Sequence, residues 1–143
     1  MILIDANLLL YAYDSSSEHH KAAADWLSAS FSRPEPVGLA WVTILAFLRI
    51  GTHPRMRAQP FSLTEAVDIV QQWLDQPNVR IVTRTGRHWT ILKDLIGTAQ
   101  VRAALVTDAH LAALAIEHGA ILYTTDRDFT RFPGLKWSNP LEA

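Results

Sequence analysis

Four aspartates stand where their carboxylates could act together. Asp5 and Asp126 each follow an apolar run that is typical of a buried strand, and Asp128 lies two residues beyond Asp126. Asp108 begins an expected helix, where the backbone dipole favours negative charge. Because ligands gather at the carboxyl ends of parallel strands, neighbouring strands would bring these acids to one edge. Carboxylates that crowd together either take up protons or share a divalent cation, and an all-oxygen ligand set suits Mg²⁺ or Mn²⁺.

A carboxylate-held metal predicts attack on a phosphodiester, because such ions stabilise in-line displacement at phosphorus. The alternative is that each acid has only a local role. Asp108 would then favour the start of its helix, and Asp126 and Asp128 would belong to a turn. Three acids at edge positions favour the metal, although each taken singly fits the local role.

Other chemistries lack their residues. The chain has no cysteine, which excludes disulfides, thiolate metal sites and a thiol nucleophile. It has no G-x-S-x-G turn, no glycine-rich phosphate loop, and no H-E-x-x-H among its six histidines. Asn7 stands two residues after Asp5, where an aspartyl-phosphate enzyme of the haloacid dehalogenase type needs a second acid.

The elements that must position the acids alternate between strands and helices. Apolar periodicity predicts helices over residues 7–13, 19–31, 41–50, 62–74, 86–98 and 108–118, the last capped by Thr107. Strands are expected over 2–4, 79–82, 120–124 and 135–137. The helix over 41–50 is apolar almost all round, which predicts a buried central helix. This order predicts an α/β sandwich, a mostly parallel sheet with helices on both faces.

Length and composition set the frame for these elements. The chain has 143 residues and 16.0 kDa, which fits a single domain over residues 1–143. The longest apolar stretch, residues 37–48, falls short of the ~20 that a membrane helix needs. No basic residue precedes the apolar N-terminus, so a signal peptide is not expected and we place the protein in the cytoplasm.

Net charge does not exclude a nucleic acid. The 13 Lys and Arg against 14 Asp and Glu give −1. Setting aside the four edge aspartates leaves 13 basic and 10 acidic side chains, so the rest of the chain is positive. The near-neutral total reflects acids concentrated where a cation is expected.

Three segments together resemble a known family. They are Asp5-Ala6-Asn7-Leu8-Leu9, the run from Thr107 to Ala115, and Thr124-Thr125-Asp126-Arg127-Asp128-Phe129. In this order and spacing the chain resembles PIN domains, and among them the VapC toxin ribonucleases of bacterial toxin–antitoxin pairs. The resemblance spans nearly the whole chain and implies a PIN-like three-layer sandwich and Mg²⁺-dependent endoribonuclease activity.

The resemblance also implies roles for individual residues. Asp5 and Asp108 match the principal metal ligands, Asp126 a further acid, and Asp128 an auxiliary one. Three neighbours would orient them as outer groups: Asn7, Thr107 and Thr125. The candidates for RNA phosphate contacts are Arg49, Arg127 and Arg131.

One expected ligand is missing. Many members of the family carry a glutamate three residues before the position of Arg49, where this chain has Ala46, and the neighbouring register offers Phe47. One ion could suffice, or Asp14, Asp128 or an RNA phosphate could complete the shell.

The family likeness implies partners as well. It implies an RNA substrate, a homodimer and a cognate VapB-like antitoxin, with no membrane association. Trp26 and Trp73 lie on amphipathic helices and belong either to a groove for a partner helix or to the core.

Two other functions remain open from the sequence. The first is a PIN-fold RNA- or protein-binding module whose catalysis is weakened by Ala46; three retained acids speak against it. The second is a receiver-like phosphotransfer domain, which needs paired acids after the first strand and a lysine at the edge. Here Asp5 stands alone there and Lys93 lies mid-helix.

Overall fold

A parallel five-stranded sheet forms the middle layer of the molecule. The computed structural model describes residues 1–142. The strands are β1 (Ile2–Ile4), β2 (Val37–Ala40), β3 (Val79–Val82), β4 (Ile121–Tyr123) and β5 (Trp137–Ser138). Their order is β3-β2-β1-β4-β5, and every pairing is parallel. The sheet thus places all five carboxyl ends along one edge, with β1 at its centre.

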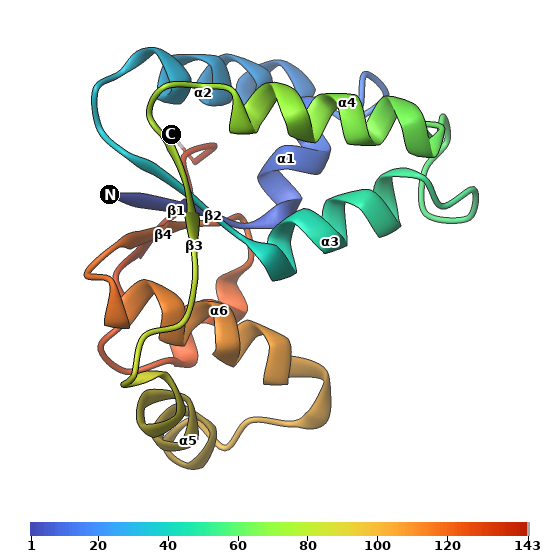
Figure 1. Ribbon diagram of the computed structural model, residues 1–143. Helices are drawn as coiled ribbons and strands as arrows, with labels where there is room; N and C mark the ends of the chain where they lie inside the picture. The colour runs from blue at the N-terminus through green and yellow to red at the C-terminus, as the bar shows by residue number, and fades with distance from the viewer. Residues whose placement is uncertain (143) are drawn as a thin grey trace.

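Helices cover both faces of the sheet (Figure 1). One layer holds α1 (Ala6–Ala12), α2 (His20–Ser32), α3 (Trp41–Gly51) and α4 (Leu63–Leu74), and the other holds α5 (His88–Thr98) and α6 (Val106–Glu117). Two 3-10 turns, η1 (Ala103–Leu105) and η2 (Arg127–Arg131), complete the order. The expected α/β three-layer sandwich is confirmed.

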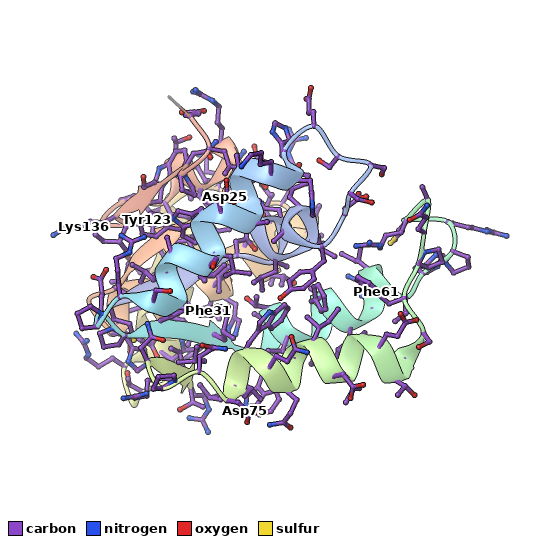
Figure 2. The ribbon with its side chains drawn as sticks, turned by 90° about the horizontal axis from the view of Figure 1, so that it is seen from above. Asp25, Phe31, Phe61, Asp75, Tyr123 and Lys136 are labelled. Atoms are coloured by element: carbon purple, nitrogen blue, oxygen red, sulfur yellow. The ribbon has the colours of Figure 1, made fainter. Side chains whose placement is uncertain are left out.

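Successive side chains of a strand point to opposite faces of the sheet, so the molecule has two hydrophobic cores, one on each face. Ile2 and Ile4 pack with α1 to α4, whereas Leu3 between them packs with α6. This is the two-residue period of a strand with both faces covered. The first core contains an aromatic cluster of Tyr13, Phe47, Phe61 and Trp73, in which the Phe47 and Trp73 ring centroids lie 4.6 Å apart. Figure 2 shows Phe61 near the junction of α3 and α4.

Several boundaries follow from local chemistry. The Ser62 hydroxyl accepts from the Glu65 N–H while the Glu65 carboxylate accepts from the Ser62 N–H, a reciprocal cap that starts α4. The expected cap by Thr107 is wrong, because α6 already begins at Val106 after η1 and Leu105 is its N-cap.

Two details differ from the sequence expectations, and a third decides between two alternatives. Strand β2 was not expected, because its residues Val-Gly-Leu-Ala lack the β-branched pattern of a strand. Gly38 fits there because an added Cβ would lie 2.6 Å from the Val82 side chain. The expected all-round burial of α3 is wrong, because Trp41 and Leu45 are 54% and 60% exposed. Trp73 belongs to the core, where it is 1% exposed.

No helix within residues 1–142 is long and apolar enough to cross a bilayer.

Candidate active site

Asp5 and Asp126 lie at the point where the strand order switches direction. Asp5 directly follows β1 and Asp126 follows β4, its neighbour in the sheet. Connections from β1 lead to β2 on one side, while β4 and β5 lie on the other. Ligands of open parallel sheets bind at such a switch point. The chain thus brings residues 121 positions apart to one place.

The Asp5 carboxylate is fixed by three donors. Its Oδ1 accepts from the Ala6 N–H at 2.8 Å, which caps α1. Its Oδ2 accepts from the Thr124 hydroxyl at 2.8 Å and from the Asn7 amide at 3.3 Å. Burial raises the pKa of Asp5, with a further increase from Asp126, while the bonds from Thr124 and Ala6 lower it. The side chain is therefore rigid and partly desolvated.

Thr124 is the hub of this arrangement. It is fully buried, and its hydroxyl donates to Asp5 while accepting from the Asn7 amide at 3.1 Å and the Asp126 N–H at 3.0 Å. The sequence prediction had named Thr125, whose N–H only reaches the Asn7 Oδ1 at 3.4 Å. Thr124 could have been found from the two-residue period, since it shares a face with buried Leu122.

Asp108 faces the other acids from α6. Burial is the largest cause that raises its pKa, to about 6, followed by the charges of Asp5, Asp126 and Asp128; Arg131 opposes them. Of the four aspartates named from the sequence, Asp108 therefore lies close enough to the other three for their charges to act on it, and Asp126 acts on Asp5 as well. Asp128 is exposed, and its backbone N–H binds the Asp126 carboxylate at 2.9 Å.

The remaining site residues predicted from the sequence differ in how close they lie to the acids. Arg131 lies beside the acids, 3.6 Å from the Asp128 carboxylate. Arg127 pairs with Glu142 at 3.1 Å. Arg49 is exposed in the last turn of α3, and Thr107 is exposed in the first turn of α6; neither has a bond to the acids within the described residues.

No acid on α3, and none directly after α1, takes the place of the missing glutamate. Phe47 is fully buried in the aromatic cluster, and Ala46 is half-buried without a polar group. Asp14 accepts from the Ser16 hydroxyl at 2.6 Å, and this bond lowers the pKa of Asp14. It is not among the groups that act on Asp108.

The chemistry of the donors fits a hard cation. Within residues 1–142, no three acid or histidine side chains stand close enough to enclose an ion by themselves. Mg²⁺ does not need such an enclosure, since it keeps several waters and binds one or two carboxylates plus substrate phosphates. The rigid Asp5 and the repulsion felt by Asp108 provide negative charge that such an ion would neutralise.

Thr124→Val tests the hub. We expect kcat for the site's reaction to fall about 10- to 100-fold, the usual cost of removing a group that orients a ligand. Losing the Thr124 bond also raises the pKa of Asp5. Thr124→Ser should restore activity because it keeps the hydroxyl, and Thr125→Val should have the smaller effect. Equal kcat losses in Thr124→Val and Thr125→Val would contradict the assignment.

Asp108 should make metal-free stability depend on pH. Its folded pKa of about 6 lies above the ordinary 3.8, so the folded state binds the extra proton between these values. The free energy of unfolding therefore falls as pH rises from about 4 to 6, by about 1 kcal/mol after solvent screening. In EDTA, Asp108→Asn should melt above wild type at pH 7.5 and equally at pH 4. A variant that melts lower at pH 7.5 would contradict this.

A polar chain of three side chains lies next to this site. The Glu117 carboxylate, completely buried, accepts from the Thr85 N–H at 2.6 Å and lies 2.6 Å from His88 Nδ1. His88 Nε2 lies 2.9 Å from Nδ1 of His110, two residues beyond Asp108. Burial and then His88 lower the pKa of His110, while Glu117 raises it. No local pattern in the sequence indicates these contacts, because the paired residues are 22 and 29 positions apart.

Comparison with known proteins agrees with the geometry. The family model described as PIN domain matches residues 2–135. The chain is 43% identical over 140 residues to Ribonuclease VapC37 of Mycobacterium tuberculosis, covering 98% of this chain and 97% of that protein. It is 38% identical over 141 residues to Ribonuclease VapC33 of the same species, covering 99% of each.

Solved structures share the fold at low sequence identity. VapBC-1 from nontypeable Haemophilus influenzae matches with a TM-score of 0.73 and 14% identity, over 99% of this chain and 100% of that one. VapC20 of Mycobacterium tuberculosis, described as a toxin that cleaves the sarcin-ricin loop, matches at 0.59 and 19%, over 95% and 99%. With its fold, its whole-length relatives and its matched model, the chain belongs to the PIN domain family.

Proposed function

We propose that this protein is a Mg²⁺-dependent endoribonuclease and the toxin of a VapBC-like toxin–antitoxin pair in the cytoplasm, with Mn²⁺ as an alternative ion. The observation that carries the proposal is the meeting of Asp5, Asp108, Asp126 and Asp128 at the carboxyl edge of the sheet. The whole-length similarity to proteins named VapC ribonucleases supports RNA as the substrate.

Asp5, Asp108 and Asp126 would supply the carboxylates for the ion, one or two of them binding it directly and the others through its waters, with Asp128 nearby. The chemistry that an ion bound there would supply is activation of a water and neutralisation of charge on the scissile phosphate. The chain's own groups prepare this site. Thr124 and Asn7 keep the Asp5 carboxylate in one orientation.

Arg131 gives the site its nearby positive charge. Its guanidinium lies beside Asp128 and is the cation that acts on Asp108. A phosphate that enters between it and the acids would be held by a group whose planar fork suits phosphate oxygens.

The decisive test is cleavage of RNA by the purified protein. We expect products that end within the RNA chain when Mg²⁺ is present, no products in EDTA, and recovery when Mg²⁺ or Mn²⁺ is added back. Cleavage that persists at full rate in EDTA would overturn the metal-dependent assignment.

A binding module with weakened catalysis is the second candidate, favoured by the absence of an acid at Ala46 and Phe47. It predicts RNA binding without cleavage under every metal condition. The same assay therefore separates the two functions.

Partners are part of the proposal. Related structures are described as VapBC toxin–antitoxin complexes, one from Salmonella typhimurium bound to DNA. Exposed Leu45, Leu63 and Val67 provide apolar surface on α3 and α4 of the kind that partner chains cover. Induced expression should arrest growth, and coexpression of a small antitoxin gene beside it should relieve the arrest. Light scattering should report a dimer.

A further inference from the structure

A shallow cavity lies beside the acids on the same edge of the sheet. Trp41 and Val42 directly follow β2, and Thr83 and Arg84 directly follow β3; the other lining residues are Val82, His110 and Leu114. The cavity has a volume of about 220 Å³. Since β2 is the neighbour of β1 and His110 lies two residues beyond Asp108, the cavity adjoins the site that holds Asp5 and Asp108.

The cavity walls combine an aromatic plane, an apolar floor and a cation. Trp41 is 54% exposed, which is unusual for so large an apolar side chain. Val82 and Leu114 are buried and apolar. Arg84 is exposed and has no hydrogen bond or ion pair to any residue within 1–142. A ligand with a flat ring next to a phosphate group would fit this cavity. The ring could lie against Trp41 and the apolar floor, and the phosphate could contact Arg84.

The buried chain from Glu117 determines what His110 presents to the cavity. When each imidazole carries a single ring proton, the Glu117 carboxylate accepts a hydrogen bond from the His88 Nδ1–H. His88 Nε2 is then an acceptor, so His110 must donate from its Nδ1. The remaining nitrogen of His110, Nε2, is left as an acceptor with no protein partner within the described residues. The chain thus fixes the tautomer, as a carboxylate does for a catalytic histidine.

We propose that this cavity is a nucleotide subsite of the ribonuclease site. An unpaired base stacks on Trp41, a hydrogen-bond donor of the same nucleotide reaches His110 Nε2, and Arg84 contacts the adjoining phosphate. This rests on the proposed function, because the ligand is a part of the RNA that the acids cleave. Glu117 and His88 are positioning residues in this arrangement.

Trp41 is tested with a matched tryptophan control. Stacking of one base is worth about 5- to 150-fold in affinity. We expect Trp41→Ala to raise KM for a cleavable RNA within that range with kcat nearly unchanged, and Trp41→Phe to retain most of the affinity. Trp89→Ala removes a tryptophan that is 65% exposed on α5 and does not line the cavity, so its KM should equal wild type.

His110 and Glu117 are tested with modified RNA. His110→Ala should raise KM, and replacing one donor of the nucleotide should raise KM for wild type but not for His110→Ala. A 2′-deoxy series and a series with purine in place of adenine show whether the donor is the 2′-hydroxyl or the exocyclic amine. In Glu117→Gln the side-chain amide N–H donates to His88 Nδ1. His88 Nε2 then donates to His110 Nδ1, and His110 Nε2 carries the ring proton instead of accepting a hydrogen bond. The KM of Glu117→Gln should therefore no longer depend on whether the nucleotide carries that donor, while circular dichroism should show that the fold is kept.

The outcomes separate this inference from the proposed function. If wild type neither cleaves nor binds RNA, the ribonuclease assignment fails and the subsite with it. If Asp108→Asn abolishes cleavage while Trp41→Ala and His110→Ala leave KM unchanged, only the subsite is overturned. A Trp41→Ala variant that loses its dimer and keeps its affinity for RNA would overturn the subsite as well, because the surface would then belong to a second copy of the chain. His110 is partly exposed and belongs to neither apolar cluster, so His110→Ala keeps the test valid if Glu117→Gln does not fold.

Discussion

Asp108→Asn is expected to lower kcat for RNA cleavage by more than about 100-fold, exceeding the usual effect of a change around a metal ligand. The substitution keeps size and removes the charge that would hold the ion and that now faces Asp5, Asp126 and Asp128. Asp5→Asn should do the same, since the Asp5 carboxylate accepts from Thr124 and Asn7 and would be one of the principal metal ligands. Cleavage would be followed on a labelled RNA under single-turnover conditions with saturating Mg²⁺.

Asp68→Asn is the matched control for both variants. Asp68 is exposed on α4, in the opposite layer from Asp108, and should retain the full rate. Isothermal titration with Mg²⁺ should show weaker binding in both site variants and not in this control. Undiminished cleavage by Asp5→Asn and Asp108→Asn would refute the assignment of the site.

Phe47→Ala should cause the largest loss of stability. The ring is fully buried and packs against Trp73, Tyr13 and Phe61, so its removal leaves a cavity in a close-packed cluster. Such truncations cost about 3–5 kcal/mol, which for a chain of this size lowers Tm by roughly 10 °C or more.

Two further variants serve as comparisons for the loss of stability in Phe47→Ala. Leu45→Ala, on the same helix and 60% exposed, should change stability by no more than about 0.5 kcal/mol. Phe47→Leu should fall between the two because it fills part of the space. Urea unfolding would measure all three, and equal midpoints for Phe47→Ala and Leu45→Ala would refute the packing argument.

The same packing explains why the glutamate found in many members of the family could not occupy the position of Phe47. A carboxylate there would stand among three aromatic side chains, and an unpaired buried charge costs several kcal/mol. The sequence could show that the acid was absent at Ala46 and Phe47. The expected buried helix over residues 41–50 includes Phe47, but the sequence could not show which side chains surround it, since Trp73 is 26 residues away in the chain.

The main site could be predicted because its signals are local. Apolar runs that end in Asp5 and Asp126 reveal strand ends, and a parallel sheet then places both acids at one edge. Thr124 and Thr125 are adjacent and alike in type, so only the pleat of β4 and its extension decides which hydroxyl turns inward. The role of Thr124 was therefore missed.

Features that depend on distant contacts could not be predicted. Strand β2 has weak local preference, and it is stabilised by pairing with β1 and β3, with Gly38 allowing the close approach of Val82. The Glu117–His88–His110 chain joins two helices that the sequence predicted separately. In both cases the information lies in the pairing of segments rather than in either segment.

The central place of β1 sets the order in which activity can arise during synthesis. The residues of β1, Ile2 to Ile4, leave the ribosome well before Ile121 to Tyr123, the residues with which they pair. At about 5–20 residues per second, Asp126 follows Asp5 by several seconds or more. Of these acids the nascent chain first carries Asp5 alone, and it lacks Asp126 even after Asp108 has been made. A growing chain therefore has no complete acid cluster with which to attack its own messenger until the segment that carries Asp126 has been made and has paired with β1.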